Sequence, residues 1–317
     1  MSNLTFISTF LLLEFSNIRE LQIVYFFVFL ALYLMAITGN LLIIIAVTLD
    51  HHLHTPMFFF VLNFAVMDIG TISVTIPKSM AMSLTNNRSI SFSGCVAQVF
   101  CYFFCLSSDF CLLIIIALDR YVAIYNPLQY ERIMHKGACL QMVATVWIIG
   151  LSYAMIHTGG TFANTFCSNV VSQFFCEVPQ LLKLSCSKTF LVEGGLLILS
   201  CMIALGGFIF IIITYVRIFA AVLRIPSVHG QKKALSTCLP HLVVISVFIF
   251  SAVFAYGKPP SNTSSDLDLA FAVTYVIIPP ILNPFIYSMR NKELKAALRK
   301  LIDLELFSKI RIKLLHN

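Results

Sequence analysis

Two residues that could do chemistry stand side by side in this chain, Asp119 and Arg120, within the stretch IIALDRYVAIYNP that runs from Ile115 to Pro127. The 23 residues between Cys95 and Asp119 carry a single formal charge, Asp109. A carboxylate beside a guanidinium could be a catalytic pair, or it could be an ion pair that locks the mouth of a membrane helix. The rest of the chain decides between these two roles.

Two further acids, Asp68 and Asp109, lie in the middle of apolar stretches. A charge at such a position in a membrane costs at least ~3 kcal/mol unless it is compensated, so buried acids are candidates for function. The two carboxylates could share a cation, relay a proton, or stay protonated and hydrogen-bonded. Three amides inside apolar stretches could complete a polar core: Asn40, Asn63 and Asn283.

Three histidines in the stretch HHLH suggest a metal site: His51, His52 and His54. The stretch has no fourth ligand nearby and lacks the i, i+4 spacing of a helical metal pair, so we expect solvated loop side chains instead. The chain also contains no glycine-rich phosphate loop, no G-x-S-x-G and no H-E-x-x-H. No set of nucleophile, base and oxyanion donors is visible, and the sequence does not predict an enzyme.

The elements that must position these residues are indicated by composition. The chain has 317 residues, of which 59% are hydrophobic and 11% charged, and its mean hydropathy is +0.92. A soluble domain carries about 25% charged residues, and a transmembrane helix needs about 20 apolar residues. The sequence therefore predicts an all-α membrane protein with seven transmembrane helices, at Val24–Leu49, Met57–Met80, Val96–Tyr125, Leu140–His157, Val192–Leu223, Leu235–Tyr256 and Leu269–Met289.

One domain is expected over residues 1–317, with 1–23 outside the cell, the bundle at 24–289 and a cytoplasmic segment at 290–317. With the N-terminus outside, 15 of the 21 lysines and arginines lie on the inner side and 6 on the outer side, as the positive-inside rule favours. The net charge of +7 is thus a topology signal, and no nucleic-acid partner is expected.

The chain termini carry further signals. We expect no cleavable signal peptide, so that the first span directs insertion, and we expect glycosylation at Asn3 on a free tail. At the other end, RNKELKAALRKLIDL places apolar residues at helical spacing beside basic ones. That pattern predicts a short amphipathic helix on the inner membrane surface, in contact with lipid.

Four cysteines fall on the predicted outer side, where disulfides form: Cys95 at the start of the third span, and Cys167, Cys176 and Cys186 in the long outer loop. Four thiols allow three pairings, and the residues alone do not choose among them. The other six cysteines lie in apolar stretches and are expected to be inert thiols.

The motifs taken together resemble the odorant receptors, which are rhodopsin-like G-protein-coupled receptors, over nearly the whole chain. The resemblance rests on stretches that occur in this order: Gly39-Asn40, LHTPMFFF at Leu53–Phe60, LNFAVMD at Leu62–Asp68, IALDRYVAIYNPL at Ile116–Leu128, KALSTCLPHL at Lys233–Leu242 and PPILNPFIYSMRN at Pro279–Asn291.

The resemblance implies that Asp119 holds Arg120 at rest, and that Arg120 faces the C-terminal helix of a G-protein α subunit when the sixth helix swings out. Tyr215 would stabilise the open form. The implied G protein is the olfactory stimulatory type, which raises cyclic AMP. The seventh-helix hinge would be formed by Asn283, Pro284 and Tyr287.

The resemblance also implies an allosteric sodium ion at Asp68 and Asp109, no other cofactor, and the disulfides Cys95–Cys176 and Cys167–Cys186. It implies a multi-pass protein of the plasma membrane, in olfactory cilia. The chain departs from the family pattern at several positions: Asp109 replaces the usual Glu, Leu118 the usual Tyr and Tyr125 the usual Cys, and Ile249-Phe250 replace Tyr-Gly.

The ligand implied by the resemblance is a small, volatile, neutral and hydrophobic odorant between the outer halves of the third, fifth and sixth helices. No acid or base stands at the lining positions, so neither an amine nor a carboxylate is favoured. Ser107, Ser200 or Tyr256 would supply hydrogen bonds. The expected lining residues are Tyr102, Phe103, Leu106, Ser107, Leu199, Ser200, Ile203, Ala204, Ala252, Val253 and Tyr256.

Three alternatives remain at this point. The paired membrane acids suggest a secondary transporter, although no internal repeat supports it. Asp119-Arg120 or the histidines suggest a membrane enzyme, and the seven spans also suit a receptor for a peptide or a lipid.

Overall fold

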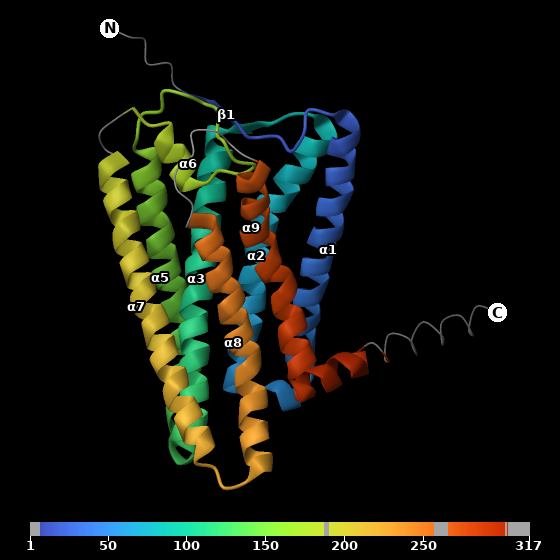
Figure 1. Ribbon diagram of the computed structural model, residues 1–317, viewed down its shortest axis with the longest axis vertical. Coiled ribbons are helices and arrows are strands. Elements are labelled where there is room, and N and C mark those ends of the chain that lie inside the picture. The colour runs from blue at the N-terminus through green and yellow to red at the C-terminus, as the bar shows by residue number, and fades with distance from the viewer. Residues whose placement is uncertain (1–6, 187–189, 257–265, 302, 304–317) are drawn as a thin grey trace, which may run out of the picture.

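The computed structural model describes residues 7–186, 190–256, 266–301 and 303, with side chains at all of these except 190, 233, 237, 251–256, 266–270, 289 and 290. Seven long helices run side by side through this part of the chain (Figure 1), and all seven are long and apolar enough to cross a membrane. The predicted all-α bundle is therefore confirmed. The helices are α1 (Arg19–Leu49), α2 (Pro56–Thr85), α3 (Phe92–Tyr125), α5 (Lys136–Phe162), α7 (Phe190–Leu223), α8 (Val228–Tyr256) and α9 (Asp266–Arg290).

The helices are longer than the apolar runs that predicted them. Helix α1 begins at Arg19, so the predicted boundary at residue 24 falls inside the helix. Hydropathy marks the segment that suits hydrocarbon, whereas backbone hydrogen bonding continues into polar residues beyond it. The ends are set by local chemistry: the Ser91 hydroxyl accepts from the backbone N–H of Gly94 to begin α3, and Asn86 ends α2 with a φ of 53°.

Helix α3 lies at the centre of the bundle, packed against α2, α5, α7 and α8. Helix α7 is at the periphery, with many exposed large apolar side chains, as expected where a helix faces lipid rather than water. The central position of α3 brings its polar residues, Asp109 and Asp119 among them, into contact with the rest of the bundle.

One end of the bundle, here called the disulfide end, carries β1 (Thr9–Leu11), β2 (Ser89–Ser91) and α6 (Val178–Lys183) (Figure 1). The two strands pair antiparallel, with Phe10 opposite Ile90. Leu11 also bonds to the loop between α5 and α7, donating to the Asn169 carbonyl at 2.7 Å. The expectation of a free N-terminal tail is therefore wrong for this segment. Asn3 itself lies outside the described residues.

The opposite end, here called the basic end, carries η1 (His51–Leu53), η2 (Pro127–Gln129), α4 (Tyr130–Ile133) and the helix 292–301. That last helix turns away from the bundle axis after α9 (Figure 1). Leu294 and Ala297 are buried against the bundle, whereas Lys295 and Arg299 are exposed. The predicted amphipathic helix is thus present, with its apolar face on the bundle.

Candidate functional site

The loop between α5 and α7 is fastened over the disulfide end by two disulfides, Cys95–Cys176 and Cys167–Cys186. These are the pairings that the resemblance implied. Gln98 of α3 reinforces the first one, because its side-chain oxygen accepts from the backbone N–H of Cys176 at 2.8 Å. The loop is therefore held directly on the end of α3.

A buried acid, Glu177, follows Cys176 and ties the loop to α9. Its carboxylate accepts from the Tyr275 hydroxyl at 2.8 Å and from the Gln173 amide at 3.4 Å. Burial raises the pKa of Glu177, and the two hydrogen bonds act in the opposite direction. Phe175 packs between the Tyr102 and Tyr275 rings, so this contact closes the loop over the residues predicted to meet a ligand.

The predicted ligand residues of α3 point into the bundle. Tyr102 and Phe103 are buried, and Leu106 packs against the same apolar cluster. The Ser107 hydroxyl donates to the Phe103 carbonyl one turn back, at 2.6 Å. Its hydrogen is therefore used within α3, and the oxygen can only accept from a ligand.

The predicted ligand residues of α7 fall on two faces of that helix. Ser200 and Ala204 are partly buried on the side that packs against α3 and α5, whereas Leu199 and Ile203 are 56% and 66% exposed. Leu199 and Ile203 thus lie on the exposed side of the helix, and their contact with a ligand stays a prediction. The side chains of Ala252, Val253 and Tyr256 lie outside the described residues.

An acid–base pair that the sequence analysis missed lies beside Ser200. Nδ1 of His157 in α5 is 2.5 Å from Oε1 of Glu193 in α7, and both side chains are buried. Nε2 of the same imidazole is 3.0 Å from the Ser200 hydroxyl. Phe103 and Tyr153 pack against the imidazole in tilted arrangements, with ring centroids at 5.4 Å and 4.3 Å. Glu193 is the single acid of α7, and a lone acid in an apolar helix could have been recognised in the sequence as a candidate for a buried pair.

Asp68 and Asn283 bring α2 and α9 together in the middle of the bundle. The Asn283 amide donates to both carboxylate oxygens of Asp68, at 3.3 Å and 3.0 Å. Asp109 of α3 is buried as well. Within the described residues, Oδ1 of Asp109 and Oδ1 of Asn283 are buried without a hydrogen-bond partner. Unpartnered oxygens of this kind suit an oxygen-preferring cation.

The Asp119–Arg120 pair lies at the basic end and is buried. The Arg120 guanidinium donates twice to Oδ2 of Asp119, and Nε does so at 2.9 Å. The other carboxylate oxygen accepts from the Tyr130 hydroxyl of α4 at 2.7 Å. Burial and Asp119 raise the pKa of Tyr130, so its hydroxyl keeps the proton that it donates. This is the closed arrangement that the resemblance assigns to the resting state.

The remaining predicted switch residues lie in α7 and α9. The Tyr215 hydroxyl is 2.6 Å from Nδ1 of His241, and this contact ties α7 to α8. Tyr287 is buried in the apolar cluster that also contains Tyr215. Pro284 packs against Gly39 so closely that an added Cβ would lie 3.1 Å from the proline ring, which explains the small residue there. The role of His241 was not predicted.

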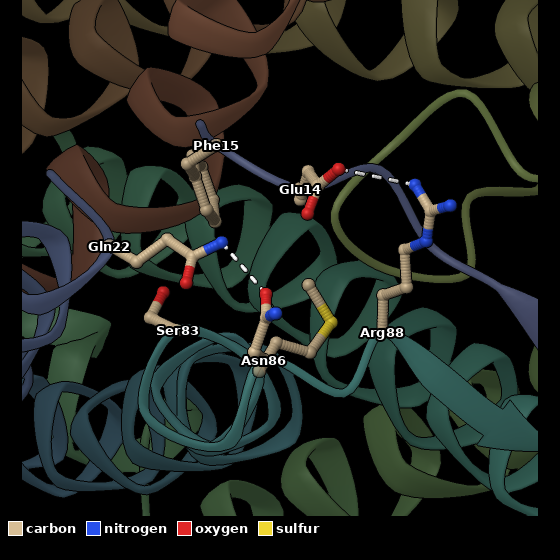
Figure 2. A pocket seen from close by; sticks show the side chains of 7 residues that line it. Glu14, Phe15, Gln22, Ser83, Asn86 and Arg88 are labelled. Carbon is tan, nitrogen blue, oxygen red and sulfur yellow. Dashed lines mark hydrogen bonds and ion pairs between the residues drawn. The ribbon is translucent and has the colours of Figure 1, made fainter. Parts of the chain in front are cut away.

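Two other features lie apart from these groups. His51, His52 and His54 are exposed. A small hollow opens at the disulfide end between the N-terminal segment and α2 (Figure 2). Its polar side chains satisfy one another, since Arg88 is 3.3 Å from Glu14 and Gln22 donates to Asn86 at 2.9 Å. The side chains around the hollow hold the N-terminal segment on the end of the bundle. None of the predicted ligand residues lines it.

Comparison with a solved structure identifies the fold. The fold matches squid rhodopsin with a TM-score of 0.71 at 18% sequence identity, over 92% of this chain and 88% of that one. The molecule therefore has the fold of a seven-transmembrane rhodopsin-like receptor.

Sequence relatives define the family. A family model described as olfactory receptor matches residues 29–304. Human olfactory receptor 14A16 is 47% identical over 98% of this chain and 100% of its own length, and human 14I1 is 48% identical over 95% and 97%. Mouse olfactory receptor 1J21 is 44% identical over 97% and 99%. The chain belongs to the olfactory receptor family.

It is accordingly a G-protein-coupled receptor for odorants in the plasma membrane, and it is not an enzyme. Asp119 and Arg120 are therefore not a catalytic dyad. Membership of this family also excludes the transporter alternative. The paired acids Asp68 and Asp109 belong to the receptor core.

Proposed function

We propose that this receptor is activated by a small, neutral, hydrophobic odorant and that it signals through the stimulatory olfactory G protein, raising cyclic AMP. The observation that carries the proposal is the buried Asp119–Arg120 pair at the basic end, capped by Tyr130. A permanently charged guanidinium that is covered at rest is suited to be uncovered by a movement of its neighbours.

The movement would start from the Tyr215–His241 contact. His241 belongs to α8, and its imidazole is held by the Tyr215 hydroxyl of α7. An outward swing of α8 would separate the two side chains and free the Tyr215 hydroxyl. It could then bond to Arg120 once that side chain leaves Asp119, so the same tyrosine would serve both states.

The odorant would lie among the disulfide-end halves of α3, α7 and α8, beneath the loop held by Cys95–Cys176. Tyr102, Phe103 and Leu106 supply apolar surface there. An apolar wall with few polar groups is the usual make-up of a small-molecule site. It favours an uncharged ligand with one or two polar atoms.

The disulfide end would face outward, on the cilia of olfactory neurons, with the basic end in the cytoplasm. Disulfides belong to oxidising compartments, and the exposed Lys295, Arg299 and Lys300 of the helix 292–301 suit anionic lipid headgroups. An epitope tag before Asn3 should be detected on intact cells, and one after Lys313 only after permeabilisation. The reverse pattern would refute this orientation.

Asp68 and Asp109 would hold a sodium ion. Their carboxylates, together with the unpartnered Oδ1 of Asn283, supply the oxygen ligands that such a cation requires. The ion would compensate two carboxylates in a buried site and hold α2, α3 and α9 in the resting arrangement. Replacing sodium with a large organic cation should then increase odorant potency, and Asp109→Asn should remove that dependence.

The central test uses cells that express the receptor with the olfactory α subunit and a cyclic AMP reporter. An odorant panel should evoke a rise that Arg120→Ala abolishes while surface expression stays intact. Thr145→Ala is a control, because the Thr145 hydroxyl donates to the Gln141 carbonyl at 2.8 Å on the exposed side of α5 and has no hydrogen bond to either member of the pair in the described part of the chain. A response that survives Arg120→Ala would overturn the proposed coupling.

A further inference from the structure

The segment that precedes α1 lies as a middle strand between β2 and the loop that joins α5 to α7. On one side, β1 pairs antiparallel with β2. On the other side, the Leu11 N–H donates to the Asn169 carbonyl at 2.7 Å, and the Val171 N–H donates to the Leu11 carbonyl at 2.8 Å. The Leu13 N–H donates to the Gln173 carbonyl at 2.9 Å. The loop is therefore held by this segment as well as by its disulfides.

The segment is itself fixed by buried side chains. Phe10 and Leu12 have almost no exposed surface, and the Leu12 N–H donates to the Arg88 carbonyl at 2.9 Å. Arg88 also pairs with Glu14 beside the hollow of Figure 2. Buried side chains of this kind are closely packed, so the segment can act as a firm support for the loop beside it.

Hydrogen bonds continue from the segment to α9. Gln173 accepts from Leu13 with its backbone carbonyl and donates from its side-chain amide to Glu177 at 3.4 Å. Glu177 in turn accepts from the Tyr275 hydroxyl at 2.8 Å. Gln173 and Glu177 are both buried. The contact that closes the loop on the bundle is therefore joined to the N-terminal segment through one residue, Gln173.

Aromatic contacts follow the same course. The centroid of the Phe15 ring is 4.7 Å from that of Phe29 in α1 and 5.3 Å from that of Phe174 in the loop. The Phe174 centroid is 4.9 Å from that of Phe175, which is 5.6 Å from that of Tyr102. Phe174 and Phe175 are completely buried, so neither ring can shift unless its neighbours shift too. Phe15 thus lies behind the two rings that cover Tyr102, a predicted ligand residue.

We propose that the segment Thr9–Phe15 positions Phe175 above the odorant, and that it thereby sets the length of odorant that the receptor accepts. This inference rests on the proposed function and places a determinant of selectivity outside the seven helices. Phe15 acts as a positioning residue, since its ring contacts in the described structure are with α1 and Phe174.

The direction of the effect follows from packing. Removing the Phe15 ring leaves a space behind Phe174, and the surrounding side chains relax part of the way into such a space. Phe174, and with it Phe175, would move away from Tyr102. The room beneath the loop would then lengthen, and longer odorants would bury methylene groups that the native receptor excludes.

The test measures a ratio of potencies in the cyclic AMP assay, for the longest and the shortest compounds of one series that activate the native receptor. The probes are straight-chain alcohols from butanol to dodecanol and methyl ketones of the same lengths. Phe15→Ala should raise the potency of the longer compound relative to the shorter one by at least about fourfold, the effect of one newly buried methylene group. Phe15→Leu removes less of the side chain and should change the ratio in the same direction by a smaller factor.

Phe27→Ala is the matched control. Phe27 lies in the same half of α1 as Phe29, but it is 61% exposed and its ring contacts its neighbour Phe26. The control should leave the ratio unchanged. Surface expression is measured in parallel with the epitope tag before Asn3. A segment needed only for folding would lower surface expression and both potencies together, so the ratio would stay at its native value.

The outcomes separate the two proposals. If no compound evokes a signal that requires Arg120, the proposed function fails and this inference fails with it. If such signals occur, the Phe15 variants decide. This inference alone is overturned if both keep the native ratio, shift it toward the shorter compound, shift it no more than Phe27→Ala does, or fail to reach the cell surface.

Discussion

The two buried acid–base pairs lie at opposite ends of the bundle and differ in how they are built. Asp119 and Arg120 are neighbours on one helix, and the arginine is always charged. Glu193 and His157 lie on different helices, 36 residues apart, and Nε2 of the imidazole reaches on to the Ser200 hydroxyl. The first pair joins two neighbouring side chains of one helix. The second joins α5 to α7, because imidazole carries a second nitrogen that can form a further hydrogen bond.

The largest effect is expected from removing one member of the Glu193–His157 pair at the disulfide end. His157→Leu strands the Glu193 carboxyl in an apolar site and should lower the free energy of unfolding by about 3 kcal/mol, because a buried charge loses its partner. His157→Leu/Glu193→Leu should restore most of that loss. Thermal unfolding of detergent-solubilised receptor measures both. A double variant no more stable than the single one would mean that the pair is not coupled.

Gly160→Ala tests the same pair without changing either member. The new Cβ would overlap the Glu193 carboxylate, so the unfolding free energy should fall by about 2 kcal/mol. Gly159→Ala is the matched control: its Cβ would meet nothing within 4 Å, and alanine is the better helix former. Equal melting temperatures for the two variants would show that Glu193 does not depend on the close approach of α5.

Asp119→Asn tests the Asp119–Arg120 pair at the basic end. The change removes the charge that holds Arg120, and a charge-assisted hydrogen bond contributes about 1.5–3 kcal/mol. Asparagine keeps a weaker, uncharged hydrogen bond, so we expect a net loss of about 1.4 kcal/mol and a rise of about tenfold in the ratio of open to closed receptor, seen as a higher basal cyclic AMP. Tyr130→Phe removes one hydrogen bond and should raise the basal signal less. A basal signal unchanged by both variants would contradict the proposal that Asp119 and Tyr130 hold the receptor in its closed arrangement.

The smallest effect concerns Glu177, a buried acid whose partners are a hydroxyl and an amide rather than a base. Burial raises the pKa of Glu177, so the folded receptor binds this proton more tightly than the unfolded chain. Its contribution to stability is greatest below the ordinary pKa and declines as the pH rises toward the raised one.

Glu177→Gln should remove that decline. The melting temperature of the native receptor relative to the variant should therefore fall between pH 4 and pH 7, by an amount equivalent to less than about 1 kcal/mol. The same difference at both pH values would mean that Glu177 does not change its protonation on folding.

The contrast between the pairs also explains what could be predicted from sequence. Continuous apolar runs mark all seven helices. Asp119 and Arg120 can be recognised as a pair in the sequence because they are adjacent. Pairs such as Glu193 with His157 depend on how two helices face each other, which no local pattern records. The inward face of α7 could not be predicted for a related reason. Helix α7 is apolar on nearly all sides, so its sequence has no periodicity that marks that face.

The strand in the N-terminal segment was not predicted, because the segment is held by residues that are distant in the sequence. Three residues, Thr9–Leu11, form β1, and three-residue strands carry almost no sequence signal. What holds the segment is the burial of Phe10 and Leu12 and hydrogen bonds to Arg88 and Gln173, none of which is local.

The placement of β1 also has a consequence for biosynthesis. Thr9–Leu11 leave the ribosome first, yet their partners Ser89–Ser91 and Asn169 are made much later. Strand edges that wait unpaired are prone to mispairing during translation. The earliest segment of the nascent receptor must therefore remain unassembled until more than half of the polypeptide has been inserted, and a chaperone on that side of the membrane would have its longest opportunity to act there.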